Sequence, residues 1–170
     1  MAGLSLWLVP GKPACTILEA LIAALAQRVG TPPFMPHVTL VGRVGLRGPE
    51  ARKRARDLAG RLPPVPLRLT HVSHGDEFYR CVVLEVLPSP ELMAAREEAS
   101  LIMGSGSEPY RPHLSLVYGH LAPERRESVA AEVRGMLSLP LSTSADRVEL
   151  RATAGPPADW TLEGTFRLAP

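Results

Sequence analysis

The sequence has few of the features that mark secreted or membrane-spanning proteins. It contains only two cysteines, Cys15 and Cys81, which provide neither a disulfide framework nor the spacing of a metal site. No apolar run reaches the length of a membrane span, and no basic leader precedes the first apolar segment. We therefore expect a soluble, cytoplasmic protein without a membrane partner.

Excess charge and aromatic residues are also scarce. The chain has 19 Lys and Arg against 17 Asp and Glu, and only 5% of its residues are Phe, Trp or Tyr. The densest basic tract lies between residues 52 and 56, in a predicted helix, where a solvated face explains it. This balance permits a small anionic substrate. It disfavours an extended RNA groove, which needs a basic strip interleaved with aromatic side chains.

The length and the hydrophobic pattern predict one α+β domain. A chain of 170 residues that is 45% hydrophobic suits a single domain spanning 1–170, or two small lobes that share a core, and we expect a monomer. A flexible stretch at residues 104–107 is a candidate lid. The periodicity predicts helices at 14–29, 49–62, 90–103 and 123–137, strands at 4–9, 147–153 and 161–168, and a hairpin of strands at 67–72 and 78–87.

One short phrase occurs twice, as Pro36-His37-Val38-Thr39-Leu40-Val41 and Pro112-His113-Leu114-Ser115-Leu116-Val117. Alternate side chains of a strand point to the same face. Each copy therefore predicts a strand with an apolar side facing the core and a side that carries one imidazole and one hydroxyl. The copies lie at similar positions in the two halves of the chain, which indicates a diverged internal duplication. We expect two pseudo-symmetric lobes of mostly antiparallel sheet with flanking helices, each lobe bringing one such strand to a central cleft.

Core packing explains the apolar side of each phrase but not its polar side. Two histidines can divide the work of phosphodiester cleavage, because one accepts a proton from the nucleophile while the other donates a proton to the leaving oxygen. The hydroxyls of Thr39 and Ser115 can donate hydrogen bonds to phosphate oxygens as negative charge develops. His37 and His113 are therefore the candidate catalytic residues, and the sequence does not decide which of them is the base. This chemistry requires no metal and no cofactor.

A zinc site is the competing explanation for the histidines. His71 and His74 could join His37 and His113 as ligands. Their spacing falls in a strand and turn, however, and no cysteine or acidic cluster accompanies them. We therefore predict no metal.

The paired His-x-Thr/Ser motifs resemble those of the two-histidine (2H) phosphoesterase superfamily, which has the LigT-like fold. Within it, the chain is most similar to plant and fungal cyclic nucleotide phosphodiesterases, which open ADP-ribose 1″,2″-cyclic phosphate and nucleoside 2′,3′-cyclic phosphates. The closer similarity lies in residues 4–10, 36–40, 78–84 and 112–118 and in the strand near Trp160.

The resemblance implies a role for several residues. His37 and His113 would be the acid/base pair, and Thr39 and Ser115 would hold the phosphate. Tyr118 matches a tyrosine that lines the family's site, although by strand parity it faces away from His113 unless the strand end twists or bulges. Trp7 would lie on a neighbouring strand and border the nucleotide, or serve as a core aromatic. No second tryptophan or basic clamp that would fix the base or a diphosphate is evident.

Metal-independent hydrolysis of a cyclic phosphodiester to a phosphomonoester is therefore the leading hypothesis. The substrate would be a small cyclic nucleotide or an RNA-derived cyclic phosphate. One alternative is RNA end processing, by a 2′,3′-cyclic RNA end phosphodiesterase or a 2′,5′-RNA ligase-like enzyme. Another is a nucleotide-binding module without catalysis.

Overall fold

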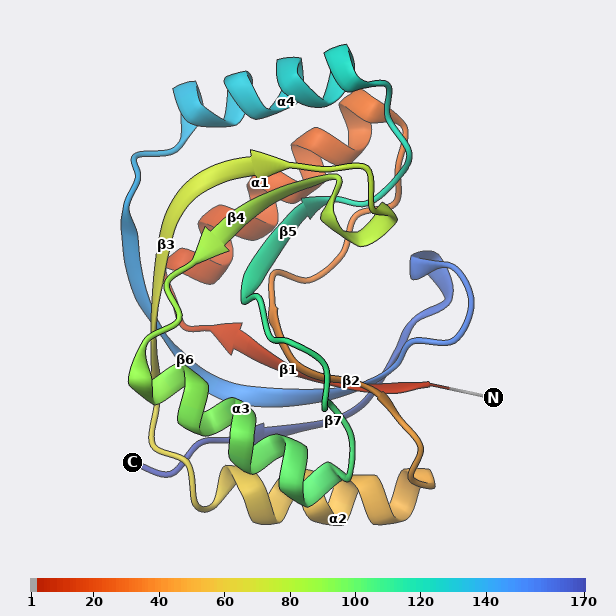
Figure 1. Ribbon diagram of the computed structural model, residues 1–170, viewed down its shortest axis with the longest axis vertical. Helices are drawn as coiled ribbons and strands as arrows, with labels where there is room; N and C mark the ends of the chain where they lie inside the picture. The colour runs from red at the N-terminus through yellow and green to blue at the C-terminus, as the bar shows by residue number, and fades with distance from the viewer. Residues whose placement is uncertain (1–2) are drawn as a thin grey trace.

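Seven strands and four helices make up the chain, of which the computed structural model describes residues 3–170 (Figure 1). The strands are β1 (Leu4–Pro10), β2 (Val38–Val44), β3 (Val65–His74), β4 (Val82–Val86), β5 (His113–Val117), β6 (Leu141–Ala152) and β7 (Thr161–Arg167). The helices are α1 (Ala14–Val29), α2 (Gly48–Ala59), α3 (Pro90–Met103) and α4 (Pro123–Met136), with 3₁₀ turns η1 (Phe78–Arg80) and η2 (Pro157–Asp159). The predicted α+β class is confirmed.

All strand pairs are antiparallel, and the strands follow the order β1-β2-β5-β4-β3-β6-β7. The first part of β6 pairs with β3 and its second part pairs with β1. On the opposite side, β2 and β5 meet at one residue pair, Val38 with Leu114. The long strand β6 therefore joins the two parts of the sheet along its length, whereas the two strands that carry the repeated phrase diverge on either side of a single contact.

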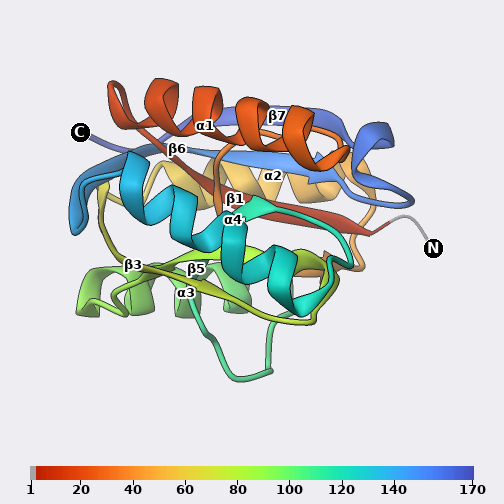
Figure 2. The ribbon, with the colours of Figure 1, turned by 90° about the horizontal axis from the view of Figure 1, so that it is seen from above.

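The helices cover the sheet in a reciprocal arrangement. Helix α1 precedes the first phrase in the chain but packs on β5, and α3 precedes the second phrase but packs on β2. Helix α4 packs on β3 and β4, and α2 packs on β6 and β7. Viewed from above, α1 and α4 lie in front of the strands, while α2 and α3 lie behind them (Figure 2). The two halves of the chain are therefore interleaved around the site.

Local sequence explains where the elements begin and end. Ser89 caps α3, because its Oγ accepts a hydrogen bond from the backbone N–H of Leu92 (3.3 Å), and Pro90 occupies the first helical position. Val38 and Leu114 are completely buried, which agrees with the predicted core side of each phrase. None of the helices within residues 3–170 has both the length and the apolar composition that crossing a bilayer requires.

Three predicted boundaries were wrong. The strand predicted from residue 78 begins at Val82, because residues 78–80 form the turn η1, closed by a hydrogen bond from the Arg80 N–H to the Glu77 carbonyl (2.9 Å). Strand β6 begins at Leu141 rather than at residue 147, because pairing with β3 extends a polar segment that has no apolar alternation of its own. Helix α2 stops at Ala59 rather than at residue 62, because the next residues form a turn, closed by a hydrogen bond from the Arg61 N–H to the Leu58 carbonyl (3.0 Å), that leads into Pro63 and Pro64.

The loop between α3 and β5 is fastened along β2. Three side chains from α3 and the loop donate hydrogen bonds to backbone carbonyls of β2, beyond the point where β5 leaves it. They are Tyr110 Oη to the Thr39 carbonyl (3.0 Å), Arg96 Nη1 to the Leu40 carbonyl (2.5 Å) and Ser105 Oγ to the Gly42 carbonyl (3.0 Å). The nearly buried Arg96 also donates to the Gly106 carbonyl (2.6 Å). The stretch 104–107, a candidate lid, is therefore tied to the backbone of β2, the strand that carries Thr39.

Gly106 should be a sensitive position in this loop. Its φ is +96°, and a Cβ there would lie 2.5 Å from Nη2 of Arg96, whose guanidinium cannot move without breaking its hydrogen bonds to two carbonyls. We expect Gly106→Ala to lower the free energy of unfolding by about 2 kcal/mol or more, measured by urea denaturation.

Gly104→Ala is the matched control. Gly104 also has a positive φ, +64°, but a Cβ there meets nothing within 4 Å, so the expected loss is only about 1 kcal/mol. Equal losses for the two variants would show that the Arg96 contacts do not hold the loop.

Candidate active site

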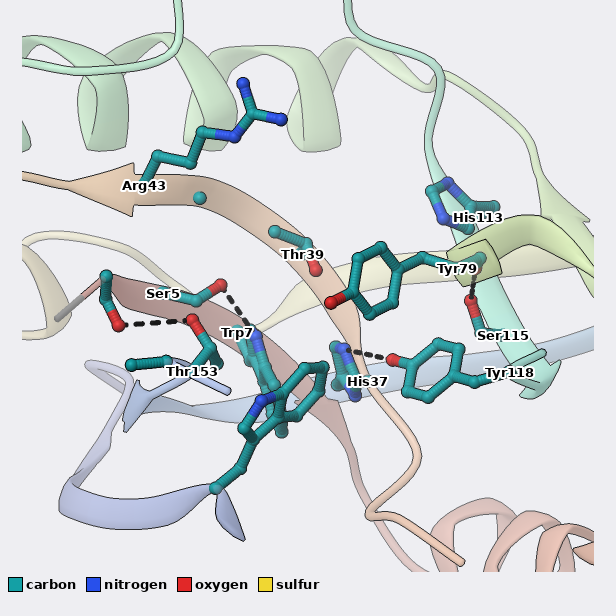
Figure 3. A pocket seen from close by; sticks show the side chains of 14 residues that line it. Ser5, Trp7, His37, Thr39, Arg43, Tyr79, His113, Ser115, Tyr118 and Thr153 are labelled. Carbon is teal, nitrogen blue, oxygen red and sulfur yellow. Dashed lines mark hydrogen bonds between the residues drawn. The ribbon is translucent and has the colours of Figure 1, made fainter. Parts of the chain in front are cut away.

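Pairing of Val38 with Leu114 brings the polar residues of both phrases to one face. In an antiparallel pair, the residue before one partner lies across from the residue after the other. His37 is therefore next to Ser115, and Thr39 is next to His113. Figure 3 shows the four side chains at the corners of a square, with the two histidines on one diagonal. The sequence-predicted residues thus converge from β2 and β5, as expected.

His37 is buried and fixed in one orientation. Its Nδ1 lies 2.7 Å from the Met35 carbonyl, so Nδ1–H donates there and Nε2 remains free of hydrogen. The Tyr118 hydroxyl lies 3.5 Å from that Nε2. The imidazole stacks on Trp7 with a centroid distance of 3.5 Å and an angle of 6° between the planes. His37 is therefore preorganised with Nε2 available as a proton acceptor.

The surroundings of His37 disfavour its protonated form. Burial lowers the pKa of His37 to about 3, and the positive charges of His113 and Arg151 act in the same direction, while the Met35 carbonyl opposes them. Arg151 lies 5.3 Å from the Trp7 ring, and because β1 lies between β2 and β6, it approaches the face opposite His37. Trp7 therefore separates the imidazole from a guanidinium.

His113 repeats the same backbone anchor in a more open place. Its Nδ1 lies 2.9 Å from the Arg111 carbonyl, again two residues earlier in the chain. Arg80 Nη1 lies 2.7 Å from the same nitrogen, so Nδ1 donates to the carbonyl when it is protonated and accepts from Arg80 when it is not. Arg80 Nη2 donates to Glu85 (2.9 Å). Burial lowers the pKa of His113, as do the Arg80 and Arg111 charges, while the Arg111 carbonyl and Glu85 raise it. Both histidines thus direct Nε2 away from the backbone.

The two hydroxyls differ in their availability. Ser115 Oγ donates to the Tyr79 carbonyl (2.7 Å), so it must exchange this bond to donate to a ligand. The Thr39 hydroxyl makes no hydrogen bond within residues 3–170 and lines the cavity. Tyr118 follows directly after β5 and also lines the cavity, which removes the objection from strand parity. Burial raises the pKa of Tyr118 far above neutrality, so its hydroxyl stays a neutral donor.

An aromatic wall, formed by Trp7, Tyr79 and Trp160, borders the site. Trp160 lies 5.8 Å from both Trp7 and Tyr79, centroid to centroid. Trp7 is covered on both faces, so it can offer a ligand only its edge, whereas the Tyr79 side chain is half exposed. Sequence reasoning missed Tyr79 and treated Trp160 only as part of a similar strand. The pairing of β6 with both β1 and β7 brings Trp160 to Trp7.

These residues line a cavity of about 490 Å³. Besides the four motif residues and the four aromatic ones, its walls include Gly3, Ser5, Gly42, Arg43, Thr153 and Ala154. No carboxylate is among the described residues of the lining, and Arg43 is the one Lys or Arg there. The cavity therefore favours an anion. Sequence reasoning did not single out Arg43.

The alternative zinc site does not form in the part of the chain that the structure describes. No group of three or more His, Cys, Asp or Glu side chains converges among residues 3–170. His71 Nδ1 lies 2.9 Å from the Thr70 hydroxyl, and His74 Nε2 lies 2.6 Å from Glu127. His71 and His74 therefore belong to surface contacts and not to the cavity.

Comparison with known proteins agrees with this geometry. The sequence model of the cyclic phosphodiesterase-like protein family matches residues 1–168. The chain belongs to this family. Cyclic phosphodiesterase from Arabidopsis thaliana is 32% identical over 125 residues, which cover 73% of this chain and 69% of that protein.

Solved structures show the same fold at low sequence identity. Escherichia coli LigT complexed with phosphate superposes with a TM-score of 0.60 at 15% identity, over 99% of this chain and 98% of that one. LigT complexed with 3′-AMP gives 0.60 at 16% identity, with the same coverage. TT0787 of Thermus thermophilus gives 0.62 at 16% identity, over 98% and 97% of the two chains. The predicted LigT-like, two-histidine phosphoesterase fold is thereby confirmed.

Burial of neutral His37 should make stability fall in mild acid. Below its ordinary pKa of about 6.5, His37 is protonated in the unfolded state. In the folded state its pKa is about 3, so it stays neutral until the pH reaches that value. The folded state therefore loses stability as the pH falls, by about 1.4 kcal/mol for each pH unit in this window. We expect His37→Gln to show a shallower decline between pH 6.5 and 4.5 in urea unfolding.

His120→Gln is the control, because His120 is exposed. It should follow the wild-type pH dependence. Parallel declines for wild type and His37→Gln would mean that His37 is protonated in the folded state.

Proposed function

We propose that the chain hydrolyses a cyclic phosphodiester, a nucleoside 2′,3′-cyclic phosphate or ADP-ribose 1″,2″-cyclic phosphate, to a phosphomonoester without a metal. The observation that supports this proposal is the square of two histidines and two hydroxyls, with each Nδ1 anchored on a backbone carbonyl and each Nε2 left for the ligand. Phosphodiester cleavage needs a proton acceptor and a proton donor on opposite sides of phosphorus. The LigT complexes with phosphate and 3′-AMP are consistent with a ligand of this class.

The environments of the two histidines favour different roles. His37 is more deeply buried and is neutral near pH 7, so we assign it as the base. Burial and Arg80 lower the pKa of His113, but the Arg111 carbonyl and Glu85 oppose them. Because His113 is also less buried than His37, it binds a proton more readily of the two, so we assign it as the acid. A bound phosphate anion raises the pKa of both and brings His37 closer to the range of an effective base.

The proposed reaction is a single displacement. His37 Nε2 takes a proton from water, whose oxygen forms a bond to phosphorus. The bond from phosphorus to one ring oxygen breaks, and His113 gives its Nε2 proton to that oxygen. Thr39 donates to a non-bridging oxygen, and Ser115 does so after leaving the Tyr79 carbonyl. The products are a phosphomonoester and a free hydroxyl. His37 ends the step with the proton taken from water and His113 without the proton given to the leaving oxygen, so exchange with solvent restores both histidines.

The aromatic wall gives the nucleoside a place beside the phosphate. Tyr79 and Trp160 have centroids 5.8 Å apart and planes inclined by 33°. The Trp160 Nε1–H already donates to the Gly155 carbonyl (3.1 Å). These rings can therefore contact a base by stacking, which tolerates any base because it reads no hydrogen-bonding edge.

Replacing either histidine should abolish most of the activity. We expect His37→Ala and His113→Ala each to lower kcat for hydrolysis of a 2′,3′-cyclic nucleotide by about 100-fold or more, because each removes a proton-transfer group. The phosphomonoester product is measured by phosphorus NMR or chromatography. His71→Ala, at an exposed residue of β3 outside the cavity, should leave the rate unchanged.

Near-wild-type turnover in either histidine variant would contradict the two-histidine mechanism. Binding of the nucleotide by the wild type without any turnover would support the alternative of a non-catalytic binding module.

Arg80 should set the alkaline limb of the pH profile. The Arg80 guanidinium lowers the pKa of His113. Removing Arg80 also leaves Glu85 without its hydrogen-bond partner, and the Glu85 charge raises the pKa of His113. If His113 is the acid, activity disappears as His113 loses its proton. We therefore expect Arg80→Met to move the alkaline limb of kcat/KM to higher pH.

Arg68→Met is the control for Arg80. Arg68 is an exposed arginine on β3 outside the cavity, and its loss should leave both limbs in place. A shift of the acidic limb alone in Arg80→Met would reverse the assigned roles of the two histidines.

A further inference from the structure

Strand β2 contains a bulge beside the cavity. Leu4 pairs with Val44 and Leu6 pairs with Val41, so two residues of β2, Gly42 and Arg43, lie opposite the single residue Ser5. Such a bulge changes which face the following side chains occupy. Val41 and Val44 both remain in the core, and the two residues between them lie on the side of the cavity.

Arg43 adopts a backbone conformation that arginine rarely takes. Its φ is +54°, and it is the one non-glycine residue within 3–170 with a positive φ. This region costs a residue with a Cβ about 1 kcal/mol or more, whereas glycine occupies it freely. Strain of this kind persists where the surroundings impose it, and it concentrates at ligand sites. Here the strain accompanies the placement of a cation on the cavity wall.

The charge of Arg43 has no counter-ion in the described part of the chain. It makes no ion pair and no side-chain hydrogen bond among residues 3–170, and no carboxylate lines the cavity. Arg52, by contrast, pairs with Glu163 (2.9 Å). Arg47 also makes no ion pair among residues 3–170, but it lies outside the cavity, so Arg43 is distinguished by its place on the cavity wall. Hydroxyl groups of Ser5 and Thr153 line the same end of the cavity.

This cationic end lies apart from the two histidines. In Figure 3, Arg43 stands at one end of the labelled residues, and His113 and Ser115 stand at the other. Thr39 and Arg43 are four positions apart on the same strand, which corresponds to roughly 10–13 Å of backbone. The extended side chain of Arg43 covers much of this distance. If the cyclic phosphate lies at Thr39, a second group attached to the other side of the same ribose can therefore contact the Arg43 guanidinium.

We propose that Arg43 binds a second phosphate of the substrate, attached at the 5′ side of the ribose whose cyclic phosphate lies between the two histidines. This inference rests on the proposed function and deepens it, because it names Arg43 as the residue that selects cyclic phosphates carrying a further phosphoryl or diphosphoryl group over those without one. Arginine suits this role because its planar fork donates two parallel hydrogen bonds to phosphate oxygens.

The test compares two substrates that differ only in the second phosphate: adenosine 2′,3′-cyclic phosphate and adenosine 5′-phosphate 2′,3′-cyclic phosphate. We expect Arg43→Met to lower kcat/KM for the 5′-phosphorylated substrate by about 10-fold or more, the usual effect of losing a hydrogen bond to a charged group. The rate with the unphosphorylated substrate should stay within about twofold.

Two further variants separate the role of the charge from effects on folding. Arg47→Met removes an exposed arginine four positions later, outside the cavity, and should change neither rate. Arg43→Gly removes the same charge but relieves the positive φ, so it should show the same substrate-selective loss in a protein at least as stable as Arg43→Met. ADP-ribose 1″,2″-cyclic phosphate as a third substrate distinguishes a diphosphate from a monophosphate at this position.

The outcomes separate this inference from the proposed function. Wild-type hydrolysis of both adenosine substrates, with Arg43→Met affecting them equally or not at all, would overturn the second-phosphate site and leave the phosphodiesterase activity standing. If the wild type hydrolysed neither adenosine substrate nor the ADP-ribose substrate, the proposed function and this inference would both fall.

Discussion

The contact between Val38 and Leu114 is the point on which the site depends. It is the one residue pair that joins β2 to β5, and the four motif side chains adjoin it. Both residues are completely buried. Helix α1 packs on β5 and helix α3 packs on β2. The position of the histidines is therefore secured by apolar packing on the reverse side of each strand, which leaves the polar side free to serve a ligand.

The two histidines share an anchor but not an environment. Each directs Nδ1 toward the carbonyl of the residue two positions earlier, a geometry that the repeated phrase produces twice. Around this common anchor, Trp7 and Tyr118 enclose His37, while Arg80 and Glu85 flank His113 at a more open place. Burial is the largest influence on the pKa of both histidines, and the nearby charges of Arg80 and Glu85 further modulate that of His113. A duplicated motif thereby acquires two different proton affinities.

Much of this arrangement could be predicted from the sequence because it follows from short-range patterns. The period of the apolar residues located the four helices, and the repeated phrase located the histidines and hydroxyls. Tyr79, Trp160 and Arg43 could not be found in this way. Tyr79 and Trp160 reach the cavity through strand pairings between distant segments, and Arg43 reaches it through a bulge that simple alternation does not anticipate. The start of β6 was missed for a related reason, since its polar first residues are strand only because β3 pairs with them.

The pairing of β1 with β6 also bears on the order in which the protein can be assembled. Strand β1 is synthesised well before β6, yet its longest ladder is formed with β6. Contacts between such distant segments form slowly, because a long loop must close before they contribute stability. Trp7 belongs to β1, so the aromatic ring that stacks on His37 has its full set of strand partners only after β6 has been synthesised. Nascent chains that stop before β6 would expose apolar strands and would be substrates for chaperones and proteases.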